Sequence, residues 1–181
     1  MDLVKAISEL DAEPDLHAAR LLILISAFSS TDQGTVEGLT KLAKLDFLLR
    51  YPVMLERALV AKNRPTRDVR LEDYERLSVE SQMVRYRYGP WDHRYREFLN
   101  ILIGKGLVTV RAEGRRIVIS LTDRGKDLAI ELSDNPAFQD YARRSTLLKR
   151  HFDIMGTSLM KFIYDTFPEV ISLRSNEKIP T

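Results

Sequence analysis

The chain has 181 residues, with 28 Lys and Arg against 26 Asp and Glu, and no cysteine. The absence of cysteine excludes disulfide scaffolds, cysteine-ligated zinc, iron–sulfur clusters and thiol catalysis, and 44% hydrophobic residues suffice to bury the core of one domain. The first residues are acidic where a secretion signal is basic, and the longest apolar run is far shorter than the ~20 residues of a membrane span. We therefore expect a cytoplasmic protein that does not contact a membrane.

The net charge of +2 is unevenly distributed along the chain. Residues 85–126 contain 10 Lys and Arg against 4 Asp and Glu, which gives +6, whereas the remaining residues sum to −4. Basic residues concentrated in one segment are typical of a surface that meets nucleic acid. The mildly acidic remainder is better suited to a protein partner.

The first half of the chain predicts helices. Residues 16–28 are apolar at nearly every position after Arg20, which is typical of a helix at the centre of a core. Residues 35–51 predict a second helix that Thr35 caps. The apolar face of this second helix is expected to carry Leu39, Leu42, Ala43 and Phe47.

The charged residues of the second helix are expected on its other faces. Lys41 and Lys44 should point away from the apolar face, and Asp46 should form an exposed i,i+4 ion pair with Arg50. Three shorter segments follow, namely a helix over residues 53–61 that Pro52 can begin, a solvated loop over residues 62–70, and a short helix over residues 71–77.

The middle of the chain combines strand and helix patterns. Residues 83–89 alternate like a strand, and residues 92–105 predict a helix whose apolar stripe consists of Tyr95, Phe98, Leu99, Leu102 and Ile103. Residues 107–121 hold two β-rich runs around Gly114, which suits a positive-φ turn, and predict a β-hairpin. Thr122 is expected to cap a helix over residues 122–133, whose first turn Gly125 weakens.

The remaining residues predict a C-terminal helical extension over residues 134–172 and a flexible tail over residues 173–181. Pro136 opens the extension. Its large apolar residues recur at helical spacing, and they are Phe138, Tyr141, Leu148, Phe152, Leu159, Phe162, Ile163 and Phe167. So much apolar surface predicts burial, either in the core or in a dimer face.

Residues 92–133 resemble the recognition helix, wing and closing helix of winged helix-turn-helix domains. The residues that carry the resemblance are Leu99, Leu102, Gly106, Leu107 and Val108, followed by Leu121, Thr122, Gly125, Leu128 and Ala129. The resemblance implies a mainly α protein with a small β-hairpin wing. It places a winged-helix core over residues 1–133, with the recognition-position helix at 92–105 and the wing at 107–121, before the C-terminal helices.

In such a domain the arginines of the basic segment would face nucleic acid. The solvent side of the recognition-position helix would carry Arg94, Arg96 and Asn100, and the wing would carry Arg111, Arg115 and Arg116. Arginines placed there can contact phosphates and release counterions. The alternative is a solvated charged face, and Glu97 counts against tight base readout by the helix.

A second resemblance covers most of the chain. The strings KLDFLLRYP, at residues 44–52, and RYGPWD, at residues 87–92, are similar to the middle component of bacterial ABC three-component systems, a defence group that includes Lamassu. This resemblance implies a winged-helix accessory subunit that bridges or regulates an SMC-like ABC ATPase and a separate effector, often a nuclease. Such systems act against phages and plasmids, and the subunit would help them to sense foreign DNA. Antitoxin domains similar to SocA also combine a KL-rich helix with a YGP turn.

Four residues of these strings are candidate partner-binding residues, namely Tyr88, Trp91, Arg50 and Tyr51. Trp91 is the only tryptophan, and its alternative role is that of a core anchor near a turn. If Trp91 is exposed beside Tyr88, it suits a protein interface.

No motif predicts catalysis or a cofactor. The chain lacks a phosphate-binding G-x-x-x-x-G-K-[ST] loop, its three histidines lack metal-ligand spacing, and no nucleophile elbow is present. We therefore expect a non-enzymatic interaction protein that requires no metal or cofactor. Two alternatives remain open, a winged-helix transcription regulator that forms a homodimer through its C-terminal helices and an antitoxin that masks a toxin.

Overall fold

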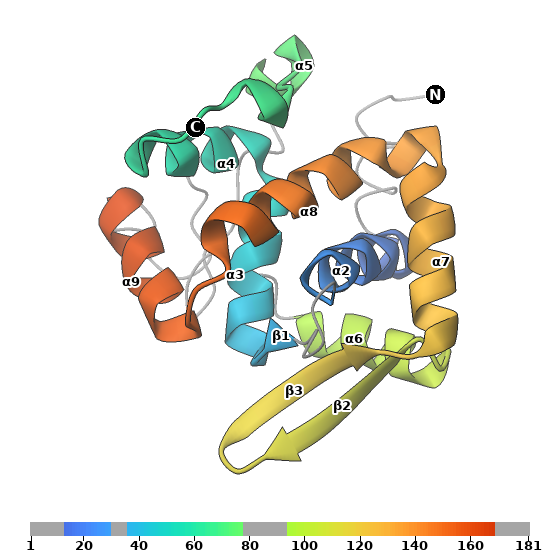
Figure 1. Ribbon diagram of the computed structural model, residues 1–181. Helices are drawn as coiled ribbons and strands as arrows, with labels where there is room; N and C mark the ends of the chain where they lie inside the picture. Colours follow the sequence, from blue (N-terminus) through green and yellow to red (C-terminus); the bar gives the residue numbers. More distant parts are fainter. Residues whose placement is uncertain (1–12, 30–35, 78–93, 169–181) are drawn as a thin grey trace.

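The described part of the protein is mainly helical, with one small antiparallel sheet (Figure 1). The computed structural model describes residues 13–29, 36–77 and 94–168. Within these ranges the elements are α2 (Pro14–Phe28), β1 (Val36–Glu37), α3 (Leu39–Arg50), α4 (Pro52–Ala61), η1 (Arg67–Val69), α5 (Asp73–Leu77), α6 (Tyr95–Gly104), β2 (Val108–Glu113), β3 (Arg116–Leu121), α7 (Asp123–Asp134), η3 (Pro136–Phe138), α8 (Gln139–Phe152) and α9 (Gly156–Thr166). The expectation of a mainly α protein with a small hairpin is confirmed.

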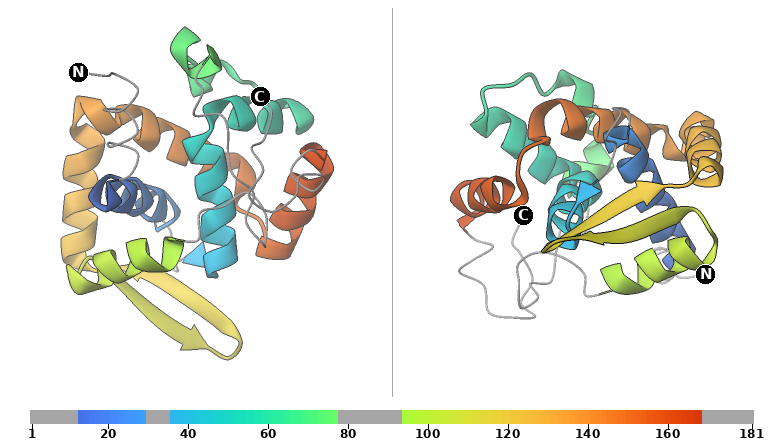
Figure 2. Two further views of the ribbon diagram at one scale, coloured as in Figure 1. Left: turned by 180° about the vertical axis from the view of Figure 1, so that it is seen from behind. Right: turned by 60° about the horizontal axis from the view of Figure 1, so that its bottom comes forward.

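Helix α2 lies at the centre of the molecule, as its sequence predicts. It packs against α3, α6, α7, α8 and β3, and the side chains from Leu21 to Ile25 are all buried. Figure 2 shows from two further sides that these helices surround α2 while the β2–β3 hairpin projects away from them. A helix enclosed in this way accounts for apolar residues at almost every position rather than along one stripe.

The sheet has the strand order β1-β3-β2, and all neighbouring strands are antiparallel. The predicted hairpin is present, and Gly114 adopts a φ of 63° in its turn. Strand β1, which precedes α3, was not expected. It pairs Val36 with Ile119 at the free edge of β3.

The second helix begins later than predicted, because strand β1 occupies the residues that were expected to form its first turn. The chain is extended at Val36–Glu37 and becomes helical only at Leu39, because Gly38 turns the chain with a φ of 91° and donates its N–H to the carbonyl of Ile117 at 2.7 Å. Pairing with β3 thus replaces the expected first turn of the helix. Thr35, the expected cap, lies outside the described residues.

The expectation of an exposed charged face on α3 was wrong. Lys41, Lys44 and Asp46 are all buried, because α3 packs against α2, α4, α8 and α9 and therefore has no broad solvent-facing side. Lys41 forms an ion pair with Asp153 at 2.9 Å. Asp46 lies in the core, so it does not form the exposed ion pair that was predicted with Arg50.

The C-terminal helices complete the same hydrophobic core. Helix α8 packs against α2, α3 and α7, and α9 packs against α3 and α4. Their buried residues belong to the cluster that contains α2, and they are Leu147, Leu148, Phe152, Leu159, Ile163 and Phe167. Of the apolar stripe predicted for α6, Ile103 is the exception, because 42% of its surface is exposed.

Besides the Thr35 cap, three further expectations fall outside the described residues. They concern the strand at residues 83–89, the candidate partner residues Tyr88 and Trp91, and the tail at residues 173–181. Helix α7, which was predicted over residues 122–133, spans Asp123–Asp134.

Candidate functional site

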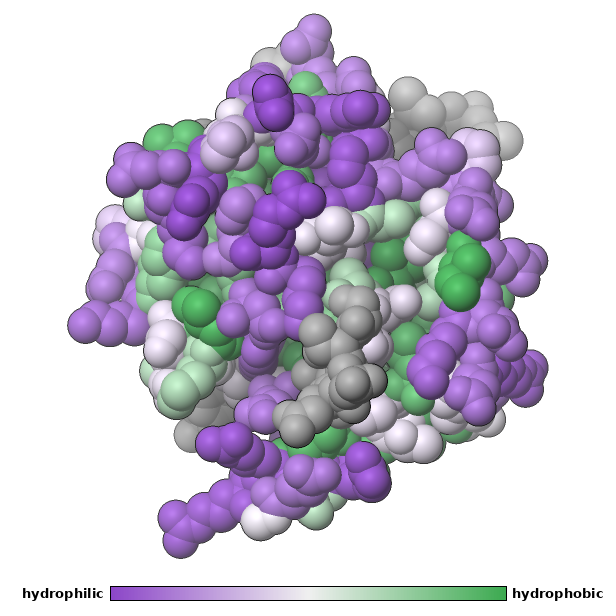
Figure 3. Space-filling view, viewed as in Figure 1, coloured by the Kyte–Doolittle hydropathy of each residue, from purple (hydrophilic) through white to green (hydrophobic). Residues whose placement is uncertain are grey.

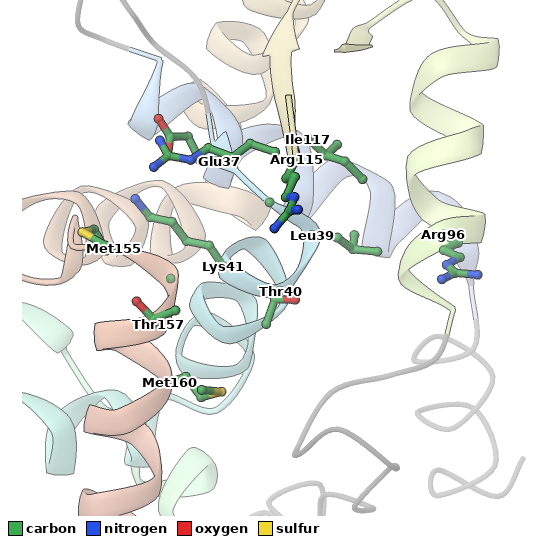
Figure 4. A pocket seen from close by; sticks show the side chains of 13 residues that line it. Glu37, Leu39, Thr40, Lys41, Arg96, Arg115, Ile117, Met155, Thr157 and Met160 are labelled. Carbon is green, nitrogen blue, oxygen red and sulfur yellow. The ribbon is translucent and has the colours of Figure 1, made fainter. Parts of the chain in front are cut away.

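A groove of about 610 Å³ opens where the hairpin, the start of α3 and the start of α9 meet (Figure 4). Three of the predicted nucleic-acid residues line it, Arg96 from α6 and Arg115 and Arg116 from the hairpin. The other lining residues are Glu37, Gly38, Leu39, Thr40, Lys41, Ile117, Met155, Gly156, Thr157 and Met160. We call this the hairpin groove. Its walls combine positive charge with apolar side chains.

The three arginines of the hairpin groove differ in their electrostatic surroundings. Arg116 donates to Glu37 across the β1–β3 pair at 3.1 Å. Arg96 and Arg115 are exposed, and neither makes a side-chain hydrogen bond or ion pair within residues 13–29, 36–77 and 94–168. Arg96 and Arg115 are therefore the two groove cations that are available to an anionic partner.

The hairpin also carries Arg111, which lies on one face together with Arg116. In the strand register Arg111 is opposite Val118, Arg116 is opposite Glu113, and Val118 is also opposite Glu37, so these residues share a face. This face of the hairpin therefore carries two arginines and two glutamates, so its formal charges balance. The space-filling view shows hydrophilic side chains over most of the hairpin tip (Figure 3).

The other predicted contact residues of α6 are placed differently. Arg94 precedes the helix, is half-buried, and holds its guanidinium 5.4 Å from the centre of the Phe98 ring. Asn100 is exposed on α6 but does not line the hairpin groove. Of the six predicted residues, three therefore share the hairpin groove, whereas Arg94, Asn100 and Arg111 are not part of its lining.

The candidate partner residues within the described ranges lie at the end of α3. Tyr51 is only 8% exposed, and its ring packs against Phe47 with centroids 5.8 Å apart. Arg50 is half-buried, with its guanidinium 5.6 Å from the centre of the Tyr51 ring. Tyr51 is a core residue, which leaves little of its ring for a partner.

A buried polar network holds α6 against α2 and α3. Arg20 of α2 donates two hydrogen bonds to Asp46 of α3, at 2.7 and 2.8 Å, and the hydroxyl of Tyr95 of α6 donates to the same carboxylate at 2.5 Å. Arg20 also lies 2.9 Å from Nδ1 of His17, whose ring stacks on Phe98. The three helices are thus joined through one carboxylate.

The ionisation of this network follows from its contacts. Burial acts against the charge of Asp46, but Arg20 and the Tyr95 hydroxyl prevail and hold the pKa of Asp46 below its usual value. Burial, together with the charge of Asp46, raises the pKa of Tyr95 well above 10. Asp46 is therefore an anion and Tyr95 a neutral donor near pH 7.

Sequence reasoning missed this network, although the sequence contains a signal for it. Arg20 and Asp46 are charged residues inside strongly apolar runs. Charged residues are fully buried almost only when they are paired, so two such residues of opposite sign predict a buried ion pair.

Two kinds of feature are absent from the residues that the structure describes. Among the residues that the structure describes, no group of three His, Asp or Glu side chains is arranged to hold a metal ion. None of the described helices is long and apolar enough to cross a membrane.

Together these features define a mainly helical protein with a small antiparallel sheet and a partly basic groove. Residues 28–146, more than half of the chain, match the family model described as ABC-three component (ABC-3C) system Middle Component 4. The chain belongs to this family and is therefore a middle component of an ABC three-component system. No curated protein and no solved structure matches it significantly.

Proposed function

We propose that this middle component is a non-catalytic accessory subunit that connects an SMC-like ABC ATPase with an effector nuclease in defence against phages or plasmids. Membership of the family supports the accessory role, since a middle component works with the other subunits of its system. The hairpin groove is the structural observation that supports binding of a partner subunit. It offers a recessed surface on which a partner subunit can dock.

The lining of the hairpin groove suits a protein segment that is both apolar and acidic. Met155, Met160 and Ile117 expose 68%, 37% and 45% of their surfaces there. Methionine side chains adapt to different partner shapes, and exposed apolar side chains gathered in a groove favour binding. Arg96 and Arg115 would pair with carboxylates of the partner.

We further propose that the elements from α2 to α7 form a variant of the winged helix-turn-helix fold. In this assignment α6 is the recognition-position helix, the β2–β3 hairpin is the wing and α7 is the closing helix. Helix α3 takes the position before the recognition helix, and α4, η1 and α5 are inserted between α3 and α6. Strand β1 lies between α2 and α3 in the chain and pairs with the wing as a third strand. This pairing supports the assignment.

Contact with DNA is proposed as a second task of the hairpin. Arg111 and Arg115 are exposed near its tip and can reach phosphates, whereas Arg116 is already paired with Glu37. Because Glu37 and Glu113 share the hairpin face with Arg111, we expect this contact to be weak and non-specific. Changing Arg111, Arg115 and Arg116 together to Ala should lower the affinity for duplex DNA, and unchanged affinity would remove the hairpin from the DNA interface.

The accessory role is tested by affinity purification from the native host, followed by mass spectrometry. We expect a large coiled-coil ATPase to co-purify with the wild type, and the double variant R96A/R115A to retain much less of it. A matched control is R124A/K161A, which removes two exposed cations outside the groove and should retain the ATPase. Recovery of no such ATPase with the wild type would contradict the proposal, and a stable dimer that binds one operator sequence would instead identify a transcription regulator.

A further inference from the structure

A second pocket, of about 340 Å³, lies where α4 and α8 end. Its lining consists of Ala61, Lys62, Asn63, Arg64, Arg150 and His151. We call it the helix-end pocket. It shares no residue with the hairpin groove and contains no acidic residue.

The cations of the helix-end pocket are brought together by the ends of the two helices. The Lys62 ammonium donates to the backbone carbonyl of His151 at 2.7 Å, which ties the end of α4 to the last turn of α8. It also lies 4.9 Å from the centre of the Phe152 ring, so its position is fixed from two sides. Arg64 and Arg150 are exposed, and their side chains form no ion pair or hydrogen bond with any other described residue.

Cations at the C-terminal ends of helices have an ordinary explanation, because each helix end carries about half a negative charge. Two helix ends therefore balance about one positive charge, whereas Lys62, Arg64 and Arg150 supply three. This excess positive charge disfavours the protonated forms of His151 and Lys62, in addition to the effect of burial. Burial, together with Arg64, Arg150 and Lys62, lowers the pKa of His151, and burial together with Arg64 lowers the pKa of Lys62.

The chemistry of the lining selects among anions. Two guanidinium groups and an amide provide several N–H donors in an open pocket, which matches the oxygens of a phosphate. The lining contains no Phe, Tyr or Trp side chain on which a base could stack, its one aromatic ring is the small imidazole of His151, and Ala61 is its one apolar residue. The pocket therefore suits a phosphate that is recognised without its base, as in the backbone of a nucleic acid.

We propose that the helix-end pocket binds a backbone phosphate of duplex DNA, through Arg64 and Arg150, with Lys62 and Asn63 beside them. The site is separate from the hairpin. The inference rests on the proposed contact of this protein with DNA, but not on the hairpin arginines. It gives the protein a second point of attachment to the DNA backbone.

The test compares the affinity of the wild type, R64A/R150A and R124A/K161A for a short duplex by fluorescence anisotropy at several salt concentrations. Loss of one phosphate contact should weaken binding about tenfold near 0.1 M salt and reduce the slope of log K against log salt by about one. The control R124A/K161A removes the same charge outside both sites and should stay close to the wild type. Arg64 and Arg150 are exposed, so R64A/R150A should keep the wild-type circular dichroism spectrum and melting temperature.

Inorganic pyrophosphate and the hairpin variant R111A/R115A/R116A complete the design. If R64A/R150A binds the duplex as tightly as the control does, the inference is wrong. If in that case pyrophosphate still raises the melting temperature of the wild type but not of R64A/R150A, the pocket takes small phosphate compounds instead of DNA. A wild type without affinity for the duplex would overturn both the inference and the proposed DNA contact. Loss of affinity in R64A/R150A but not in the hairpin variant would overturn the hairpin contact alone.

Discussion

Asp46 is the residue at which α2, α3 and α6 are held together. It accepts hydrogen bonds from Arg20 and Tyr95 and is completely buried. A buried carboxylate is tolerated only when it is paired, so its partners must keep their positions. The network therefore fixes α6, and with it Arg96, relative to the central helix.

Changing Asp46 to Asn should destabilise the protein strongly. The substitution leaves the Arg20 guanidinium buried without a counter-charge, which costs about 3–5 kcal/mol in comparable cases. The free energy of unfolding in urea measures the effect. The control is Asp165→Asn in α9, an exposed acid that should change the stability by no more than about 0.5 kcal/mol. Equal stabilities of the two variants would show that the network does not hold these helices.

Lys44 should make the stability depend on pH on the alkaline side. Burial lowers the pKa of Lys44 from 10.5 to about 8, so the unfolded chain binds more protons than the folded protein between these two values. The free energy of unfolding should therefore rise with pH from about 8 to 10.5, by up to about 3 kcal/mol.

The variant Lys44→Met tests this dependence. We expect the alkaline rise to disappear in K44M, whereas Lys161→Met, which changes an exposed lysine, should retain it. Comparing variants cancels the contributions of the other groups that titrate in this range. A rise of the same size in K44M and the wild type would mean that Lys44 is not its source.

At the scale of elements, the junction between the hairpin and α7 depends on a close approach of two backbones. The Thr122 hydroxyl accepts the N–H of Gly125 at 3.0 Å and donates to the carbonyl of Gly106 at 2.7 Å. A Cβ atom at Gly125 would collide with the carbonyl oxygen of Leu107. The glycine that weakens the helix in isolation is thus the residue that allows the helix to dock.

Gly125→Ala should therefore destabilise the protein, although alanine favours helices. We expect a loss of about 1–3 kcal/mol from overpacking against backbone. Gly104→Ala is the matched control, because Gly104 is helical and a Cβ there meets no atom within 4 Å. That control should gain up to about 1 kcal/mol. Thermal and urea unfolding measure both, and a stabilised G125A would disprove the close approach.

At the scale of the whole molecule, one core joins the N-terminal and C-terminal helices. Leu148, Phe152, Ile163 and Phe167 are fully buried together with Leu21 and Leu24 of α2. Arg144 of α8 adds polar contacts, because it forms an ion pair with Glu75 at 2.7 Å and donates to the carbonyl of Val69 at 3.0 Å. The described part of the C-terminal extension, residues 134–168, therefore contributes to the fold as a whole.

Removing the C-terminal helices should prevent cooperative folding. A fragment that ends at Asp134 would expose the core surface that α8 and α9 cover, so we expect it to aggregate or to melt without a sharp transition. The cooperativity of unfolding and the dispersion of proton–nitrogen correlation spectra are compared between the fragment and the full chain, the former by calorimetry. A sharp transition in the fragment would support residues 1–133 as an independent domain.

The sequence by itself determined the local elements, because hydrophobic periodicity, caps and glycines act over a few residues. It predicted the enclosed helix α2, the stripe of α6, the hairpin around Gly114 and the cap at Thr122. Its resemblance to a middle component of ABC three-component systems also agrees with the family match.

Only the tertiary structure decided how residues far apart in the chain meet. Strand β1 pairs with β3, and Arg64 lies near Arg150, although the partners are more than 70 residues apart in the chain. Lys44 and Asp46 are buried because other elements pack against α3 from several sides. No local pattern encodes such contacts, because the periodicity of a helix gives the direction of a side chain but not what lies there. The charge of a residue can therefore be read from the sequence, whereas its role depends on the fold around it.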